Sequence, residues 1–267
     1  MRGQLPGSPP PSKESDKKGI SSSVEMEYLL DKSHTCPVCH RVFTAKTVLA
    51  KKAESNGLDI DLMPRYKNVD LLKYRVVECP SCGYADLDQS FEKINSREAS
   101  SLKEKALKND KDAPSEVFVR EYADAYRYYK SALRCCLVRG CRSSKRGQTA
   151  INAAWLLRSW REKLKWDGYV ISDTDPMTMD EERKLIKYAL RNFKDAELNE
   201  EFPISGMDEP TFDYFMAALC YNQDEIDNAG KYVLRALSNR ALKPLLRPMA
   251  EDLRDEIKAR RHTPPQE

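Results

Sequence analysis

Apolar residues recur with a helical period of 3.6 in the C-terminal half of the chain. From Phe118 to Cys136 they are spaced by four and three in turn, which predicts a helix with one apolar face. A similar pattern over residues 153–164 predicts a second helix. A third helix is expected to begin at Thr178, because the Thr178 hydroxyl and the Glu181 carboxylate match a capping box. Three further helices are predicted near residues 209–221, 224–239 and 245–261.

Short connections join most of these helical segments, which favours helical hairpins stacked in sequence order. In the segment 216–237, the small residues Ala217, Ala229 and Ala236 have the spacing that a tetratricopeptide (TPR) repeat needs where its helix backbones approach closely. Asp224, however, stands where a TPR usually has glycine, and the repeats are unequal in length, so an irregular helical bundle is the alternative. We expect a TPR-like helical domain over residues 115–262.

The pattern is different in the N-terminal part of the chain. Residues 1–28 are rich in Pro, Ser and Lys and are predicted to be a disordered tail, because they can bury little apolar surface. Residues 29–96 contain short β-type runs, such as 41–48 and 74–78, beside two cysteine pairs, which predicts a small zinc-ribbon-like module. Residues 97–114 are polar and mostly helix-permissive, and they are predicted to form a linker that could be partly helical. The expected fold is therefore mainly α, with a four-cysteine module followed by helical hairpins.

The two cysteine pairs carry the strongest chemical signal. Pro and Val separate Cys36 from Cys39, Pro and Ser separate Cys79 from Cys82, and 39 residues lie between the pairs. Two residues between thiolates let both sulfurs of one turn reach the same ion, and a second turn facing the first completes the four ligands of tetrahedral zinc. We therefore predict a structural zinc site made by Cys36, Cys39, Cys79 and Cys82. An iron–sulfur cluster or a redox dithiol is the alternative.

Other potential metal ligands have simpler explanations. His34 and His40 flank the first pair and could replace a cysteine ligand, but two surface histidines beside a complete four-cysteine site are the simpler interpretation. A second metal site could form from the remaining cysteines, Cys135, Cys136, Cys141 and Cys220. Because two of these lie on the first predicted helix, we expect them instead to pack as small buried apolar groups.

Composition narrows the class of protein. The chain of 267 residues has no apolar run near the roughly 20 residues that span a bilayer. Its N-terminus also lacks the apolar stretch of a secretory signal. We therefore expect a cytoplasmic protein with no membrane partner, whose thiols stay reduced. The net charge of +3 is too balanced to imply nucleic-acid binding from bulk electrostatics.

The leading functional hypothesis is an adaptor that receives a protein or peptide partner on its helical surface, because helical-repeat proteins generally use that surface for recognition. Residues 130–165 carry a net charge of +9, and residues 166–228 carry a net charge of −11. The basic segment could face an acidic partner. Neutralisation of the two segments by each other is the interpretation that we favour.

Nucleic-acid binding, as a transcription-associated zinc ribbon, is the alternative hypothesis. Its basis is a short basic cluster that could neutralise phosphates, namely Arg139, Arg142, Lys145 and Arg146. Residues 31–96 contain ten bases and nine acids, so the cysteine module itself lacks the positive surface that a phosphate backbone requires.

Catalysis is not expected. The chain has three histidines, two beside the first cysteine pair and one near the C-terminus, and no phosphate-binding glycine loop or HExxH motif. The acids at 180–182 lie in the first turn of a predicted helix, where the helix dipole explains them.

Trp155, Trp160 and Trp166 could line a ligand groove, but packing between helices is the more common role of such side chains.

Several motifs together resemble a known family. They are CPVCH at 36–40, Phe43, the segment Asp59–Lys67, Tyr74 leading into CPSCGYA, and AWLLR at 154–158. In these motifs the chain resembles the uncharacterised bacterial domain-of-unknown-function family 2225. The resemblance implies a zinc-ribbon start, TPR-like helices and a bacterial, cytoplasmic setting, and it implies no established activity. His40 stands where members of the family often have glycine.

Overall fold

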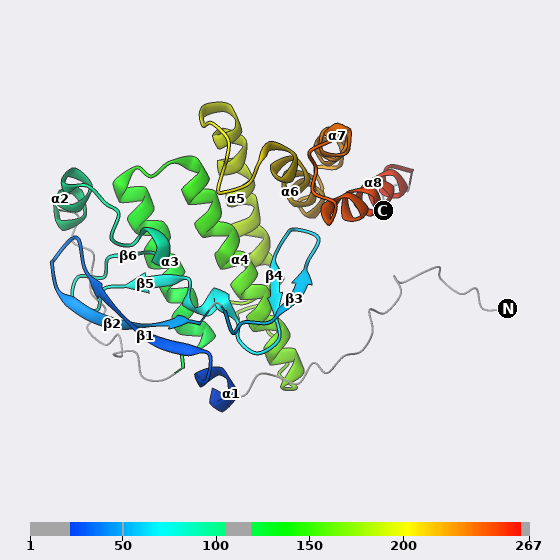
Figure 1. Cartoon of the computed structure of the whole chain (residues 1–267). Helices are drawn as coiled ribbons and strands as arrows, with labels where there is room; N and C mark the ends of the chain where they lie inside the picture. The colour runs from blue at the N-terminus through cyan, green and yellow to red at the C-terminus, as the bar shows by residue number, and fades with distance from the viewer. Residues whose placement is uncertain (1–21, 50, 105–118, 263–267) are drawn as a thin grey trace.

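The computed structural model describes residues 22–49, 51–104 and 119–262. Within these residues the chain is mainly helical, with eight α-helices, and its strands form three two-stranded antiparallel hairpins (Figure 1). In the same part of the chain, no helix has the length and apolar character that crossing a membrane requires. The mainly α fold that the sequence predicts is therefore confirmed.

Six helices follow one another in the C-terminal half, close to where the hydrophobic period predicts them. They are α3 (Tyr122–Arg139), α4 (Ser143–Trp166), α5 (Met179–Asn199), α6 (Glu209–Asn222), α7 (Ile226–Ser238) and α8 (Leu246–His262). Thr178 caps α5 as predicted, since its hydroxyl accepts a hydrogen bond of 3.3 Å from the Glu181 amide. Phe118, the first residue of the predicted apolar stripe, lies outside the described residues.

The turn between α6 and α7 explains the unusual residue in the predicted repeat. Asp224 adopts a left-handed φ of 62°, the conformation for which glycine is usually selected. Its carboxylate is held on both sides, by Arg183 at 2.6 Å and by Arg260 at 2.5 Å. The ion pairs tie the turn to α5 and α8. The helices form successive hairpins, whereas a TPR-like arrangement of those hairpins stays a prediction.

The N-terminal part consists of three β-hairpins, two short α-helices and two 3-10 helices, Leu71–Tyr74 and Asp88–Ser90. Strand β1 (Leu29–Thr35) pairs with β2 (Val42–Val48), β3 (Ser55–Leu58) with β4 (Pro64–Tyr66), and β5 (Val76–Glu78) with β6 (Ala85–Leu87). Helix α1 (Ser22–Met26) precedes the first hairpin and α2 (Ser96–Glu104) follows the last one. The two predicted β-type runs correspond to β2 and β5.

Part of the predicted tail, residues 1–28, is ordered in the structure. The Glu25 side chain in α1 is buried, where it pairs with the Lys73 ammonium at 2.8 Å and accepts a hydrogen bond of 2.9 Å from the Tyr74 hydroxyl. A buried carboxylate needs such partners, and they come from a segment that is distant in sequence. The prediction was therefore wrong for residues 22–28, while residues 1–21 lie outside the described part of the chain.

The predicted linker, residues 97–114, also begins as a structured element. Helix α2 covers its first residues, and Leu102 is 1% exposed in a small core that includes Cys36, Cys79 and Phe91. Leu102 carries the only large apolar side chain of α2, so the helical period could not reveal its burial. The remaining residues, 105–114, are outside the described ranges.

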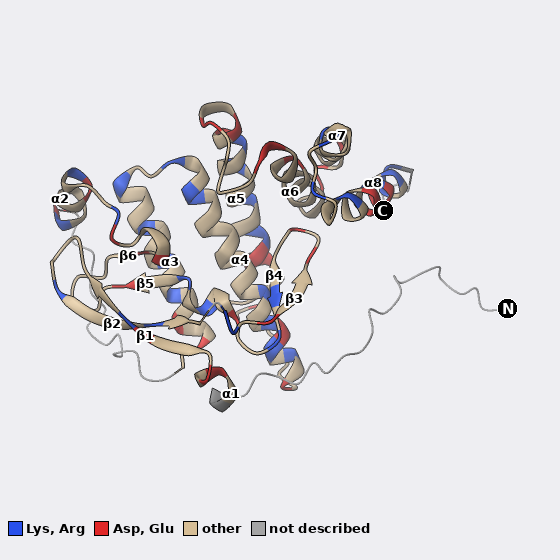
Figure 2. Ribbon diagram, viewed as in Figure 1, with Lys and Arg blue, Asp and Glu red and all other residues tan. Residues whose placement is uncertain are grey.

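The cysteine module packs on α3 and α4 (Figure 1). Met63, Leu72 and Val76 from the module belong to the same buried core as the helices. Acidic and basic residues are interspersed along both parts (Figure 2). The division into a module of residues 29–96 and a helical domain of 115–262 stays a prediction, and a buried core is shared by the two parts.

Candidate functional site

The four predicted cysteine ligands lie together at the tips of two β-hairpins. Cys36 and Cys39 occupy the turn between β1 and β2, and Cys79 and Cys82 occupy the turn between β5 and β6. Their sulfur atoms all lie within 4.8 Å of one another, and the Sγ–Sγ distance is 3.6 Å both for Cys36–Cys82 and for Cys39–Cys79. The hairpins thus bring together residues that are 40 or more positions apart.

The two cysteine turns have the same backbone geometry. In the first, the Cys36 amide donates to the Arg41 carbonyl at 2.9 Å and the His40 amide donates to the Cys36 carbonyl at 2.8 Å. In the second turn the equivalent distances, from Cys79 to the Tyr84 carbonyl and from Gly83 to the Cys79 carbonyl, are 2.7 and 2.9 Å. His40 and Gly83 both have a left-handed φ, of 62° and 70°. His40 therefore accepts a conformation that glycine adopts without steric cost.

The cluster has the dimensions of a four-sulfur metal site. Four sulfurs at about 2.3 Å from a central ion in a tetrahedron lie about 3.8 Å apart, which agrees with the two closest Sγ–Sγ distances of 3.6 Å. Cys36 and Cys79 are fully buried. Hydrogen bonds among the thiols lower the pKa of Cys79 and raise the pKa of Cys36 and of Cys82, so the four sulfurs are close enough to influence one another's charge. The four cysteines could therefore hold a metal ion.

The two histidines near the cluster occupy different environments. His40 is exposed in the first cysteine turn, as predicted. His34 is 2% exposed and its ring stacks on Phe43 and contacts the edge of Phe91, so the prediction of a surface residue was wrong. Burial lowers the pKa of His34, which favours the neutral ring among these aromatic side chains. The hydrophobic pattern of β1 did not reveal this, because the aromatic partners come from β2 and from the segment after β6.

The remaining cysteines do not form a second cluster. Among the described residues, only the four cysteines of the hairpin turns form a group of three or more potential metal ligands. Cys135 and Cys136 are buried in α3, as expected, and the Cys135 sulfur accepts a hydrogen bond from the Ala85 amide at 3.4 Å. Cys220 lies in α6 beside Glu225. A single four-cysteine centre is what the described part of the chain provides.

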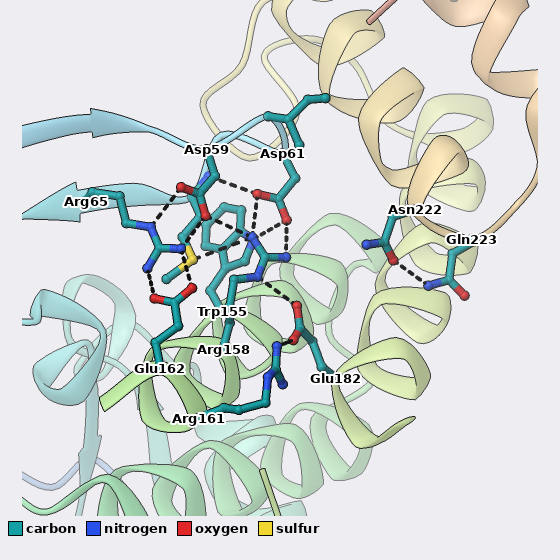
Figure 3. Close-up of polar contacts among 12 residues, drawn as sticks. Asp59, Asp61, Arg65, Trp155, Arg158, Arg161, Glu162, Glu182, Asn222 and Gln223 are labelled. Carbon is teal, nitrogen blue, oxygen red and sulfur yellow. Dashed lines mark hydrogen bonds and ion pairs between the residues drawn. The ribbon is translucent and has the colours of Figure 1, made fainter. Parts of the chain in front are cut away.

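A second polar site, which the sequence did not predict, joins the β3–β4 loop to the helices (Figure 3). Arg158 of α4 lies at its centre and makes a bidentate contact with Asp61, at 2.7 and 3.0 Å. The same guanidinium reaches Asp59 at 3.1 Å and Glu182 of α5 at 2.8 Å. Trp155 donates its indole N–H to Asp61 at 3.0 Å. We call these five residues the Arg158 network.

Two further arginines extend the Arg158 network at its edges. Arg65 pairs with Asp59 at 2.6 Å and with Glu162 of α4 at 2.7 Å. Arg161 contacts the Glu182 carboxylate and donates to the Met177 carbonyl at 3.1 Å. Each carboxylate of the network is therefore shared between two donor side chains, which is how buried charges are usually satisfied. For Asp61 and Glu182 both of these side chains come from α4.

Burial and charge act against each other at Arg158. Its side chain is 14% exposed, and those of Asp61 and Glu182 are 4% and 6% exposed. Burial lowers the pKa of Arg158, but the carboxylates of Asp61 and Glu182 outweigh this effect and raise the pKa above its ordinary value. The guanidinium is therefore held charged and fixed. Two of the three segments of this network, Asp59–Lys67 and the AWLLR motif at 154–158, occur among the motifs of the family resemblance, and this was the signal available in the sequence. Glu182 of α5 lies outside those motifs.

A cleft of about 550 Å³ opens beside the Arg158 network. The 60–61 loop, α4, α5, α6 and α8 line this cleft with both apolar and charged side chains: Ile60, Asp61, Arg158, Arg161, Met179, Asp180, Glu182, Arg183, Ala218, Tyr221, Asn222, Asp224 and Arg260. Met179 is 61% exposed and Ile60 is 39% exposed. The network thus fixes one wall of a surface hollow that carries exposed apolar side chains.

The predicted phosphate-binding cluster is largely engaged inside the molecule. Arg139 is 4% exposed and lies 2.6 Å from Asp86 of β6, and Lys145 reaches the same carboxylate at 2.6 Å. Arg146 donates to the Ser143 hydroxyl at 2.8 Å, and Arg142 is exposed. Within the basic segment 130–165, Arg139 and Lys145 are therefore paired with Asp86 of the module, and Arg158 and Arg161 with Glu182 of the acidic segment.

The three tryptophans have separate roles. Trp155 is 5% exposed and belongs to the Arg158 network. Trp160 packs against the core and stacks on Tyr122, with ring centroids 6.4 Å apart. Trp166 is 57% exposed at the end of α4. Packing between helices therefore explains Trp155 and Trp160 but not Trp166.

Comparison with known proteins gives one match. A family model described as “Uncharacterized protein conserved in bacteria (DUF2225)” matches residues 29–259. This range includes all four clustered cysteines and the Arg158 network. No curated protein and no solved structure matches the chain.

Proposed function

We propose a function for this chain on the premise that it belongs to the DUF2225 family, whose members are uncharacterised proteins conserved in bacteria. The proposed function is a non-enzymatic, cytoplasmic zinc-binding adaptor for one protein or peptide partner. The observation that carries this proposal is the cleft beside the Arg158 network, because the zinc module and the helices build it together.

Zinc is the metal that the ligand set supports best. Four thiolates in a tetrahedral arrangement suit zinc, and the same ligand set also suits iron. The hairpin turns that carry the cysteines resemble those of structural zinc modules, in which all four positions are taken by protein. A shell filled by four sulfurs leaves no position for water, which supports a structural role over metal-assisted hydrolysis.

The cleft has the character of a recognition surface for a peptide. Ile60, Met179 and Tyr221 offer apolar contacts, and Asp180 and the paired Arg183 and Asp224 place charges of both signs around them. An apolar side chain of a partner, flanked by charged residues, would match this surface. The TPR-like order of α5 to α8 that we propose would present the cleft on the concave side of the helix stack.

Site-specific crosslinking in bacterial cells tests the adaptor function. A photo-crosslinking amino acid at position 179 is expected to capture a discrete protein, because Met179 is exposed at the edge of the cleft. The same amino acid at position 245 is the matched control, since Leu245 is 70% exposed and does not line the cleft. The captured species should disappear when Ile60→Glu is added. Equal capture from positions 179 and 245, or none from 179, would contradict the proposal.

The ion pairs of Arg139 and Lys145 with Asp86 support a protein partner over nucleic acid, because these cations already have a buried counter-charge. A direct measurement separates the two hypotheses. Fluorescence anisotropy with generic single- and double-stranded nucleic acid at about 0.05 M salt, where phosphate contacts are strongest, should show no binding. Salt-dependent binding that is abolished by Arg142→Glu would favour the zinc-ribbon alternative instead.

A further inference from the structure

Helix α3 ends in a turn that brings two cysteines together. Gly140 adopts a left-handed φ of 64°, its amide donates to the Leu137 carbonyl at 3.2 Å, and the Cys141 amide donates to the Cys136 carbonyl at 3.0 Å. This pair of bonds defines a Schellman motif, in which the side chains of the residues joined by the longer bond usually contact each other. Here both of those residues are cysteines, so the turn places the Cys136 and Cys141 side chains next to each other.

The two thiols differ in access to solvent. Cys136 is fully buried in α3. Cys141 is only partly buried, and it lines a polar cavity of about 550 Å³ together with Arg142, Arg146 and Glu200. A small molecule in that cavity can therefore reach the Cys141 sulfur first, with Cys136 behind it.

The surroundings also give the two thiols different acidity. Contact with the Cys136 thiol lowers the pKa of Cys141 to about 7, with burial and Asp86 opposing this effect and Arg139 and Lys145 assisting it. The same contact, together with burial, raises the pKa of Cys136. The thiolate, which is the nucleophilic form, is therefore favoured at Cys141 over Cys136.

We propose that Cys136 and Cys141 form a reversible dithiol–disulfide site that reacts with low-molecular-weight disulfides. The Cys141 thiolate attacks one sulfur of the small disulfide, which forms a mixed disulfide and releases the first small thiolate. Cys136 gives its proton to that thiolate and attacks the Cys141 sulfur, which expels the second small thiolate, and this takes a proton from solvent. The protein dithiol is oxidised by two electrons, and the small disulfide is reduced to two thiols.

The other cysteines lack this combination of contact, access and acidity. Cys135 and Cys220 are fully buried, and burial raises their pKa values to about 11 and about 12. The four cysteines of the hairpin turns are the proposed zinc ligands, and metal-bound thiolates are shielded from exchange. The site is therefore separate from the metal centre, and the ion pair between Lys145 and Asp86 of β6 lies close enough to influence the charge of both thiols.

Mass spectrometry of the zinc-loaded, full-length protein tests the proposal. The protein is treated with oxidised glutathione at pH 7, free thiols are alkylated, and trypsin then cleaves after Arg134, Arg139 and Arg142. Peptides 135–139 and 140–142 should be joined by a disulfide and should separate after reduction. Because the first peptide contains both Cys135 and Cys136, the Cys135→Ser variant must give the same joined pair. Absence of the joined peptides, or loss of zinc before they appear, would overturn the proposal.

Matched single variants separate the two roles. Cys136→Ser should accumulate a stable glutathione adduct on Cys141, because no second thiol resolves it. Cys141→Ser should leave position 136 unmodified. Cys220→Ser is the control and should form the 136–141 disulfide at the unchanged rate. In the Cys136→Ser variant, glutathione should add to Cys141 at least about tenfold faster than to Cys220; similar rates at the two positions would contradict the assignment.

Discussion

Two regions fasten the cysteine module in different ways, the four-cysteine cluster at one end and the Arg158 network at the other. In the cluster, each half is a local turn of the same shape, so only the meeting of two hairpins is non-local. In the network, the charges come from the β3–β4 loop, α4 and α5, and Asp61, Arg158 and Glu182 find their charged partners on elements that are distant in sequence. The comparison shows that a site built from two similar local turns can be predicted from the sequence. A site whose residues come from three separate elements cannot.

The two regions also differ in what they contribute to stability. Metal binding to four thiolates can supply roughly 10–16 kcal/mol of folding free energy. Buried ion networks contribute little net stability, because desolvation offsets the attraction, yet removing one partner costs about 3–5 kcal/mol. The metal centre is therefore expected to create the fold of the module, and the Arg158 network to specify how the module sits on the helices.

The largest effect is expected from breaking the metal centre. Cys79→Ser removes a fully buried ligand, so the protein should lose its metal ion, and the hairpins should unfold with a loss of roughly 10 kcal/mol of metal-dependent stabilisation. Elemental analysis should find about one zinc per chain in the parent protein and much less in the variant. The NMR signals of β1–β2 and β5–β6 should lose dispersion. Cys220→Ser, which alters a buried cysteine outside the cluster, should retain the metal.

A smaller but clear effect is expected from removing the central cation of the Arg158 network. Arg158→Met keeps the aliphatic stem but leaves Asp61 and Glu182 buried without their main counter-charge, so the free energy of unfolding should fall by about 3–5 kcal/mol. Urea denaturation followed by circular dichroism measures this change. Lys67→Met is the matched control in the same hairpin, because Lys67 pairs with Glu54 in solvent, and its stability should be nearly unchanged. Equal losses of stability in Arg158→Met and Lys67→Met would contradict the expectation that a buried ion pair matters more than an exposed one.

The indole of Trp155 offers a finer test of the same network. Trp155→Phe removes the N–H donor to Asp61 and some buried ring area, and should cost about 1–3 kcal/mol. Arg158 still holds Asp61, so the loss should be smaller than that of Arg158→Met. Thermal unfolding monitored by circular dichroism shows which of the two variants is less stable. A larger loss for Trp155→Phe would mean that ring packing, and not the charge at Arg158, dominates the region.

The dependence of stability on pH should have opposite signs in the metal centre and in the helical part. Burial raises the pKa of Asp213 in α6 to about 6, although Arg235 opposes this. Because the folded state then binds more protons than the unfolded state between about pH 4 and pH 6, the stabilisation from protonated Asp213 is complete below about pH 4 and is lost as pH rises through 6. Protons compete with metal for thiolates, so the cluster instead loses stability as pH falls.

Asp213→Asn separates these two effects. In the variant the decline in helical stability between about pH 4 and pH 6 should vanish, while acid release of metal from the four cysteines should be unchanged. Denaturation at a series of pH values, followed through the helical signal and through metal release, measures both. If helical stability still declines over this pH range in Asp213→Asn, a titratable group other than Asp213 causes the decline.

The helical part was predictable to within a few residues at most helix ends because its apolar positions follow one period. The Thr178 cap is an example, since the capping hydroxyl and its partner amide lie three residues apart. The extent of the N-terminal part was not predictable in the same way. Glu25 is ordered by Lys73 and Tyr74, and Leu102 by the core around Cys36 and Cys79, so the deciding partners lie far away in sequence.

The sequence by itself determined the helices, the hairpin turns and the spacing of the four cysteines, because these depend on periods and turn conformations within a few residues. Tertiary structure alone decided that Asp59 and Asp61 face Arg158 and that a cleft opens beside this network. It also decided that Asp86 pairs with Arg139 and Lys145. The physical reason is that a charge finds its partner by burial and geometry in three dimensions. The composition shows only that positive and negative charges are nearly equal in number.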